Sequence, residues 1–252
     1  MIISPKNEYL KEVRKLHMAK YRKESGRFTV SGFKCVHEAL LYGNVESVIY
    51  TADMREFADM EAVSQSIRKI EVSPQVMETL DEARSPQGII AVASLKELEI
   101  SADSALLIAL DDISDPVNLG AIIRTADAVG ADGVLLSRNT SDPTSPRAVR
   151  SSMGSIFHIP VIRTDDLREE LRSLHGRGFF VMGTSLEGSE EIIAPEKTVL
   201  VIGNEAHGMS DEMLSVCDMK VRIPMYGKAE SLNASVAAGI LMYMIKGFIK
   251  GH

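Results

Sequence analysis

The sequence is poor in the residues that build metal sites and disulfide frameworks. Its 252 residues include two cysteines, Cys35 and Cys217, and six histidines. No Cys/His cluster has the spacing of a metal site, and Cys35 and His37 stand alone in a helical pattern, where we interpret them as packing residues. We therefore expect two reduced thiols and no bound metal, as in a cytosolic protein.

Long apolar runs are also scarce. The longest, Val236–Ile245, is too short to span a bilayer. The first ten residues, MIISPKNEYL, lack the apolar core of a signal peptide. With 45% hydrophobic and 25% charged residues, the composition is that of a globular protein. We expect a cytoplasmic protein that does not contact a membrane.

Basic residues are outnumbered overall, but they gather at one end. The net charge is −7, whereas residues 1–35 carry nine Lys and Arg against three Glu, a local charge of +6. Such a segment attracts phosphate without making the whole chain adhere to nucleic acid. Tyr21, Phe28 and Phe33 lie among these charges and could stack on bases. From charge alone, a solvated basic helix followed by a core strand is the favoured alternative.

The first hundred residues alternate between strand and helix patterns. Alternating or continuous apolar runs predict strands at Arg27–Phe33, Val45–Tyr50 and Gly88–Ala93. Between them, helical spacing marks residues 36–43 and a face from Phe57 to Ile67, and Ser73-Pro74 is typical of a helix start. The polar stretch Lys96–Ser104 is the best candidate linker, so we expect domains at 1–97 and 104–252.

The second part repeats the alternation more strongly. Apolar runs of strand length are joined by helical patterns, and the chain closes with a long apolar helix over Leu232–Phe248. This predicts an α/β fold whose parallel sheet is covered on both faces. Ligands of such sheets bind where loops leave the carboxyl ends of strands. The strand-length runs are Ala105–Leu110, Gly133–Leu136, Phe179–Met182, Thr198–Ile202 and Met219–Ile223.

The first candidate motif runs from Asp115 to Arg124, where Pro116 breaks the chain and a helix is expected near Asn118. The backbone N–H groups of a helix start suit a phosphate or carboxylate, and a guanidinium such as that of Arg124 can hold phosphate with two hydrogen bonds. A plainer alternative makes Asn118 the helix cap and pairs Arg124 with Asp127.

The second motif, Gly203–Gly208, directly follows a strand. Its glycines allow a tight turn and close approach of a ligand to the backbone. It is not the dinucleotide fingerprint, since no intact G-x-G-x-x-G occurs in the chain, which argues against a nucleotide-dependent oxidoreductase. Glu205 could hold a ribose or orient a hydroxyl; alternatively it caps the helix near Ser210. We interpret His207 as a surface loop residue.

The third motif lies between Ile223 and Val236. Pro224 ends a strand and Gly227 provides a turn. Ser231 is a natural helix cap, whereas Asn233, just inside an apolar helix, is harder to explain by structure alone.

Together the three motifs read N-x-G-x-x-x-R, G-N-E-x-x-G and I-P-M-x-G-x-x-x-S-L-N-x-S-V-A. In this order and spacing the chain resembles the SpoU-type RNA ribose 2′-O-methyltransferases of the SPOUT superfamily. Arg150–Ser155 is similar to the family's stretch between the first two motifs. Glu12–Leu41 and Gln87–Ile90 resemble the substrate-binding domain that many members carry. Ala206-His207 and Ala234 depart from the commoner residues without removing a polar group.

The resemblance implies a deep trefoil knot in the C-terminal domain that binds S-adenosylmethionine, a fold that pattern reasoning would not propose. It implies a homodimer through the C-terminal helix, and an RNA substrate that we expect to be rRNA rather than tRNA by analogy with members that share the extra domain. A non-catalytic RNA-binding or ribosome-assembly factor on the same fold is the alternative. The implied cofactor contacts are Thr184, Ile202, Gly203, Ile223, Met225 and Leu232, and the implied active-site residues are Asn118, Arg124, Glu205, Ser231 and Asn233.

A free guanidinium is a poor general base. Although Arg124 is proposed as the base in this family, we expect it to clamp an RNA phosphate and polarise the ribose hydroxyl. In this hypothesis Glu205, Asn118 and Asn233 hold the geometry.

Overall fold

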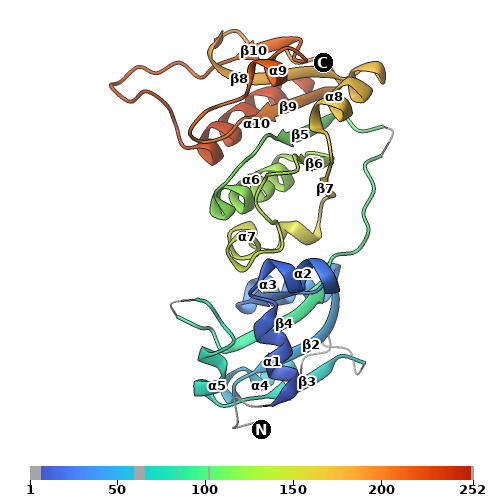
Figure 1. The fold of residues 1–252 in the computed structure, drawn as a ribbon, viewed down its shortest axis with the longest axis vertical. Coiled ribbons are helices and arrows are strands. Elements are labelled where there is room, and N and C mark those ends of the chain that lie inside the picture. The colour runs from blue at the N-terminus through green and yellow to red at the C-terminus, as the bar shows by residue number, and fades with distance from the viewer. Residues whose placement is uncertain (1–6, 60–65, 84, 102, 251–252) are drawn as a thin grey trace. The chain divides into compact units, whose positions relative to one another are not determined.

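Two sheets organise the chain, one in each of two compact units (Figure 1). The computed structural model describes residues 7–59, 66–83, 85–101 and 103–250. One unit combines Met1–Glu97 with Asp142–His158, and the other combines Leu98–Ser141 with Ile159–His252. The division into domains 1–97 and 104–252 stays a prediction.

The N-terminal unit is built on a four-stranded mixed sheet of order β1-β4-β2-β3. Strand β4 runs antiparallel to both β1 and β2, whereas β3 runs parallel to β2. The runs at Val45–Tyr50 and Gly88–Ala93 form the two central strands, which are buried along most of their length. The predicted strand Arg27–Phe33 is shorter than expected, because Phe33 begins α3. The strands are β1 (Phe28–Ser31), β2 (Asn44–Tyr50), β3 (Arg68–Glu71) and β4 (Ile89–Ser94).

Short helices cover this sheet. The side chain of Asn7 caps α1, whose Leu10 and Val13 are buried in a cluster with Ile49 and Ile90 of the sheet. The predicted helix face from Phe57 to Ile67 begins on α4, and its Met60 and Val63 lie outside the described residues. The helices are α1 (Glu8–Lys15), α2 (Ala19–Ser25), α3 (Phe33–Tyr42), the 3-10 turn η1 (Ala52–Met54), α4 (Arg55–Ala58) and α5 (Pro74–Glu78).

A segment from the middle of the chain completes this unit. Residues 142–158 form α7 (Pro146–Ser152) and the 3-10 turn η2 (Ser155–Phe157). Phe157 stacks on the buried ring of Phe28, with ring centroids 5.9 Å apart. Arg150 lies 3.6 Å from the buried carboxylate of Asp81.

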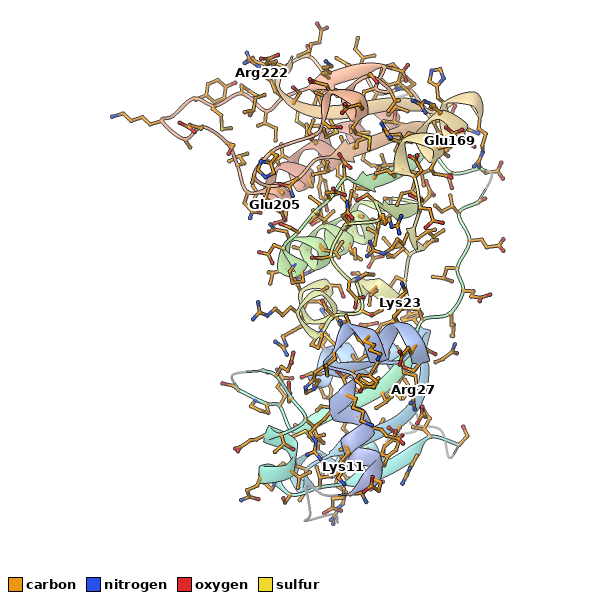
Figure 2. The ribbon with its side chains drawn as sticks, viewed as in Figure 1. Lys11, Lys23, Arg27, Glu169, Glu205 and Arg222 are labelled. Atoms are coloured by element: carbon orange, nitrogen blue, oxygen red, sulfur yellow. The ribbon has the colours of Figure 1, made fainter. Side chains whose placement is uncertain are left out.

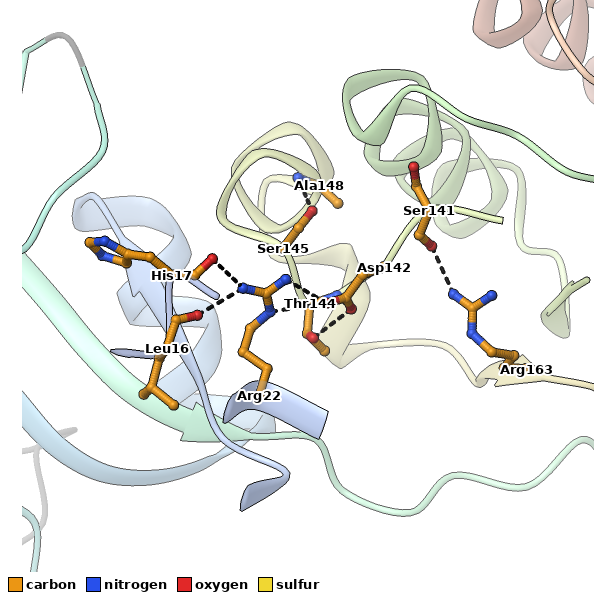
Figure 3. A network of polar contacts seen from close by, with 9 residues as sticks. All are labelled: Leu16, His17, Arg22, Ser141, Asp142, Thr144, Ser145, Ala148 and Arg163. Carbon is orange, nitrogen blue, oxygen red and sulfur yellow. Dashed lines mark hydrogen bonds and ion pairs between the residues drawn. The ribbon is translucent and has the colours of Figure 1, made fainter. Parts of the chain in front are cut away.

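Arg22 ties the start of this segment to the N-terminal helices (Figure 3). Its Nε and Nη2 donate to Oδ2 of Asp142 at 2.9 and 2.6 Å, and its Nη1 donates to the carbonyls of Leu16 and His17 at 2.8 and 2.7 Å. The Arg22 side chain is 5% exposed and that of Asp142 is 34% exposed. Burial raises the pKa of Asp142, but hydrogen bonds from Thr144 and Arg22 outweigh it and lower that pKa.

Arg22→Met is expected to lower the free energy of unfolding by about 3 kcal/mol, because it removes the cation from a partly buried carboxylate and leaves Oδ2 of Asp142 and two carbonyls without their donor. Urea denaturation measures the change. Lys20→Met is the matched control, since Lys20 lies on the same helix with a side chain that is 73% exposed. A loss below about 0.5 kcal/mol, the size of ordinary surface substitutions, would show that Arg22 does not hold the segment.

The C-terminal unit contains a six-stranded sheet of order β10-β8-β9-β5-β6-β7, in which every pairing is parallel. This confirms the α/β fold with a parallel sheet. The central strands β5 and β9 are buried along their whole length, as their continuous apolar sequences predict. The strands are β5 (Leu106–Leu110), β6 (Gly133–Leu136), β7 (Val161–Arg163), β8 (Phe180–Ser189), β9 (Thr198–Ile202) and β10 (Met219–Val221).

Helices cover both faces of this sheet. Leu171 of α8 (Leu167–Gly176) and Met213 of α9 (Asp211–Leu214) pack with the side chains that point to one face, such as Val199 and Val201. On the other face α6 (Pro116–Val129) and α10 (Ala234–Lys250) lie side by side (Figure 1). Among the described residues, no helix combines the length and apolarity needed to cross a membrane.

Candidate functional site

Three loops that carry the sequence motifs leave the sheet near one another. Strand β9 pairs with β5 on one side and β8 on the other, all in parallel. The loop after β5 carries the first motif, and the loop after β9 carries the second. Because parallel neighbours end at the same edge, both loops meet there, as the order of apolar runs predicts.

Glu205, which is labelled in Figure 2, lies on the loop after β9 and contacts the loop before α6. Its Oε2 accepts hydrogen bonds from the backbone N–H and the hydroxyl of Ser114, at 3.0 and 2.9 Å. Its Oε1 accepts from the backbone N–H of Asp115 and from Nδ2 of Asn118, both at 3.1 Å. A single carboxylate therefore holds the entry to α6 through four donors.

These donors set the protonation state of Glu205. Partial burial raises its pKa, but the hydrogen bonds from the Ser114 backbone, the Asn118 side chain and the Asp115 backbone outweigh that effect and bring the pKa to about 2. A carboxylate with so little affinity for a proton is a poor general base near neutral pH. The geometry makes Glu205 an anchor for the loop before α6.

Asn118 connects Glu205 to the third motif. The Asn118 side chain is buried, and its Oδ1 accepts a hydrogen bond from Nδ2 of Asn233 at 3.0 Å. Asn233 Oδ1 in turn accepts from the N–H and hydroxyl of Ser235, at 2.9 and 2.6 Å. Glu205, Asn118 and Asn233 thus form one chain of hydrogen bonds across the three motifs.

The capping roles considered for Asn118, Glu205 and Ser231 are wrong, and so is the placement of Asn233 just inside the helix, because Asn233 itself caps α10. Asp115, not Asn118, caps α6 by accepting from the N–H of Val117. Ser210, not Glu205, caps α9. Asn233 rather than Ser231 accepts from the first N–H groups of α10. The predicted helix over Leu232–Phe248 accordingly begins at Ala234.

Asn204 is a residue of this network that sequence reasoning missed. Its Nδ2 donates to the carbonyl of Asp112 at 2.7 Å, while its Oδ1 accepts from the N–H groups of Ala206 and His207. Asp112 has a positive φ of 57°, an uncommon conformation for a non-glycine residue. Asn204 and Glu205 therefore hold the same loop. Asn204 donates to a carbonyl of the loop, and Glu205 accepts from its backbone N–H groups. Its place beside Glu205 in the G-N-E motif was the available signal.

Gly203 lies where the turn after β9 closes. Its N–H donates to Oγ1 of Thr184 at 3.4 Å. A Cβ on Gly203 would lie 2.6 Å from the carbonyl carbon of Gly208 and 2.7 Å from the backbone nitrogen of Met209. Asn204 and Gly208 pair through backbone hydrogen bonds of 3.1 and 2.9 Å. Only glycine fits at this position of the turn. The structure places Gly203 next to Thr184, which is also a predicted cofactor contact.

Gly203→Ala is expected to lower the affinity for S-adenosylmethionine at least tenfold, and to destabilise the fold by about 1–3 kcal/mol, because backbone atoms must shift to admit the methyl group. Calorimetric titration and thermal unfolding measure the two effects. Gly227→Ala is the control, since a Cβ there meets nothing within 4 Å. Unchanged affinity in Gly203→Ala would remove this turn from the cofactor site.

The remaining predicted residues are not joined to this network. Arg124 is exposed on α6 and has no hydrogen bond or ion pair within the part of the chain that the structure describes. Ile202 is buried at the end of β9. Ser231 is exposed, and the other three lie half-buried on the long loop from β10 to α10 (Figure 1): Ile223, Met225 and Leu232.

His207 is exposed in the turn, as expected for a loop histidine. Over the described ranges no group of three His, Cys, Asp or Glu side chains is placed to hold a metal ion. Cys35 and Cys217 are both unpaired thiols. The chemistry of the site is that of amides, one anchored carboxylate and a guanidinium.

Two known families match this chain, one over the part that forms the six-stranded sheet and the other over the part that forms the four-stranded sheet. Residues 105–243 match the SpoU rRNA Methylase family, and residues 7–91 match the MRM3-like substrate binding domain. The second match confirms the similarity of the N-terminal part to a substrate-binding domain.

Known proteins are similar to this chain over almost its whole length. The chain is 36% identical over 250 residues to the 23S rRNA (guanosine(2553)-2′-O)-methyltransferase RlmP of Bacillus subtilis, covering 98% of this chain and 99% of RlmP. An AdoMet-bound rRNA methyltransferase from Sinorhizobium meliloti has a TM-score of 0.86 and 32% identity, covering 98% and 97% of the two chains. The SpoU methyltransferase AviRb from Streptomyces viridochromogenes, in complex with AdoMet, has a TM-score of 0.83 and 27% identity, covering 96% and 98%.

Proposed function

Because the chain belongs to the SpoU rRNA methylase family, we propose that it transfers the methyl group of S-adenosylmethionine to a ribose 2′-hydroxyl of 23S rRNA. The network that joins Glu205, Asn118 and Asn233 is the observation that carries this proposal. The three motifs retain every polar group needed to hold a ribose beside a methyl donor. This argues against a non-catalytic assembly factor.

Two observations favour rRNA over tRNA. RlmP, whose name specifies guanosine 2553 of 23S rRNA, is similar over almost the whole of both chains. Residues 7–91, moreover, match a separate substrate-binding domain, which provides a second surface for a large RNA. We place the protein in the cytoplasm, where ribosomal RNA is modified in bacteria.

The residues at the sheet edge fit S-adenosylmethionine. The Gly203 turn allows close approach to the backbone, and the half-buried apolar side chains of Ile223, Met225 and Leu232 suit an adenine ring. These residues, with Thr184 and Ile202, would hold the cofactor. When bound, its sulfonium supplies an activated methyl group, so no metal or redox step is required.

The protein's own residues then have to align the ribose oxygen with that methyl group. Such alignment can lower a barrier by about 7–11 kcal/mol at best. Glu205 holds the loop at Ser114, and Asn118 and Asn233 fix the start of α6 relative to α10. Arg124, exposed on α6, would clamp the RNA phosphate and polarise the hydroxyl. Ser231 would contact the ribose from the long loop.

Transfer of tritium from methyl-labelled S-adenosylmethionine tests this function. A 23S rRNA transcript should accept label on a ribose 2′-oxygen, located by resistance of the adjacent linkage to alkaline cleavage, whereas a tRNA pool should not. Preferential labelling of tRNA would replace the rRNA assignment. No labelling of any cellular RNA, with the protein folded, would favour the non-catalytic alternative.

We propose that α10 forms the interface of a homodimer. Val236, Ile240, Tyr243 and Met244 are 49%, 38%, 59% and 42% exposed and recur at helical spacing. Four large apolar side chains on one helix face are typical of a surface that is covered by a partner.

Light scattering coupled to size exclusion tests the dimer. The wild-type protein should have twice the mass of its 27.6 kDa chain, and Ile240→Glu combined with Tyr243→Glu should reduce it to a monomer. A wild-type monomer at micromolar concentration would contradict the proposal.

A further inference from the structure

The aromatic side chains of the basic N-terminal segment have three different environments. Phe28 is 1% exposed and stacks on Phe157 in the core. Tyr21 is half-buried, with Nζ of Lys15 lying 5.6 Å from its ring centroid. Phe33, by contrast, is 47% exposed at the start of α3. Of the three, Phe33 is the one whose side chain is largely exposed.

Two other rings, those of Phe57 and His37, lie close to the ring of Phe33. Phe57 of α4, only 5% exposed, has its centroid 4.7 Å from that of Phe33 at a 57° tilt. His37, one turn along α3, has its ring centroid 6.4 Å from the centroids of both other rings. The planes of the His37 and Phe33 rings make an angle of 17°. The cluster fixes the orientation of the exposed ring, so a ligand would not need to order it.

The backbone of Phe33 is fixed as well. Its N–H donates to Oε1 of Gln87 at 2.9 Å. Gly32, with φ of 91°, donates its N–H to the carbonyl of Ile89 on β4 at 3.1 Å. A ring anchored in this way is a rigid surface feature rather than a side chain that can fold back onto the protein.

The residue that follows Phe33 on α3 is a cation. Lys34 is exposed and forms no ion pair among the residues that the structure describes. Several other cations of the same unit are engaged, such as Arg27 with Glu46 and Arg55 with Glu71. An exposed aromatic ring, followed on the same helix by an exposed ammonium group on a flexible side chain, could match the base and phosphate of an unpaired nucleotide.

We infer that Phe33 is a stacking platform for an unpaired base of the RNA substrate, and that Lys34 binds the adjoining phosphate. The inference rests on the proposed function, since it names the part of the substrate-binding unit that contacts RNA. Because every base has an aromatic face, the platform can stack on any of the four bases. It therefore contributes to RNA affinity and not to the choice of target nucleotide.

Fluorescence anisotropy with the full-length protein tests the platform. The probes are a labelled 23S rRNA fragment centred on nucleotide 2553 and an unrelated single-stranded uridine-rich oligonucleotide. Phe33→Leu keeps apolar volume against Phe57 but lacks the stacking face, and should weaken binding of both probes about tenfold, the scale of one lost base stack. Phe33→Trp should bind at least as tightly as wild type.

A matched control lies on the same helix. Tyr42, 48% exposed at the other end of α3, contacts His158 edge-on with centroids 4.7 Å apart, and Tyr42→Ala should leave RNA affinity unchanged. Lys34→Gln should reduce the slope of log affinity against log salt by about 0.7, the value for one phosphate contact on a single strand.

Methyl transfer separates this inference from the proposed function. With 23S rRNA as substrate, Phe33→Leu should raise KM about tenfold and leave kcat unchanged. If Phe33→Leu binds both probes as wild type does, the platform is wrong even though the enzyme is active. If Tyr42→Ala weakens binding as much as Phe33→Leu, the contact is not specific to the Phe33 ring. Failure of the wild-type protein to methylate any RNA would contradict the proposed function, while the oligonucleotide titration would still decide the role of Phe33.

Discussion

Glu205→Gln is expected to lower kcat by about 100-fold, the scale of a roughly 1 Å misplacement of reacting groups. The carboxylate of Glu205 accepts from four donors. In either orientation, the NH₂ group of glutamine would face two of those donors, so half of the contacts become repulsive. The loop at Ser114 and the start of α6 would shift, and Asn118 would move with them. Single-turnover methylation of the RNA at saturating cofactor measures the effect.

His207→Ala is the control for this substitution, because His207 lies exposed in the same turn. It should retain wild-type turnover. Cofactor affinity in Glu205→Gln should change much less than kcat, since the Gly203 turn is retained. Turnover within a factor of two or three of wild type would show that Glu205 does not anchor the site.

The pH dependence distinguishes an anchor from a base. With a pKa of about 2, Glu205 is ionised throughout the working range. Its folded pKa lies below that of an ordinary glutamate, so its stabilising contribution is present above the ordinary value and is lost as pH falls through about 2. Between pH 5 and 9 the rate profiles of wild type and Glu205→Gln should therefore have the same shape. A limb that disappears in the variant would identify Glu205 as the base.

The convergence of the motifs was predictable because it follows from topology. The first two motifs follow the buried apolar strands β5 and β9, and in a parallel sheet neighbouring strands end at one edge. The third motif follows the edge strand β10, in which Lys220 is exposed. The role of Asn204 was not predictable in the same way. Its amide reaches the carbonyl of Asp112, 92 positions away, and a contact between a side chain and a distant backbone leaves no pattern in the sequence.

The helix caps show a related limit. Ser231 and Asn233 are both good caps by type, and local propensity does not choose between them. The choice is made by tertiary structure, because the amide of Asn233 also bonds Asn118 on α6. Likewise, the placement of residues 142–158 beside the N-terminal helices depends on Arg22 and Asp142, which are 120 positions apart. Local sequence propensity thus predicts where helices and strands occur, whereas long-range polar contacts determine at which residue a helix begins and where a segment packs.

Arg124→Lys is expected to reduce turnover about 100-fold while leaving cofactor affinity unchanged. Lysine keeps the charge but lacks the planar fork that holds a phosphate with two parallel hydrogen bonds, so the ribose oxygen would no longer be held in line. Arg172→Lys on α8 is the control, since Arg172 is exposed and, among the described residues, pairs only with Glu169 one turn earlier. Steady-state kinetics with the 23S rRNA transcript, together with calorimetric titration of the cofactor, measure both quantities.

Chemical rescue then separates the clamp from a general base. Added guanidinium should restore part of the turnover of Arg124→Ala at a constant pH, because it supplies the missing planar cation. An amine of lower pKa should not, since it offers a proton acceptor without the fork. If the amine rescues and guanidinium does not, Arg124 acts by removing the hydroxyl proton. Near-wild-type turnover in Arg124→Lys would count against the two-point clamp, because a point charge would then be sufficient.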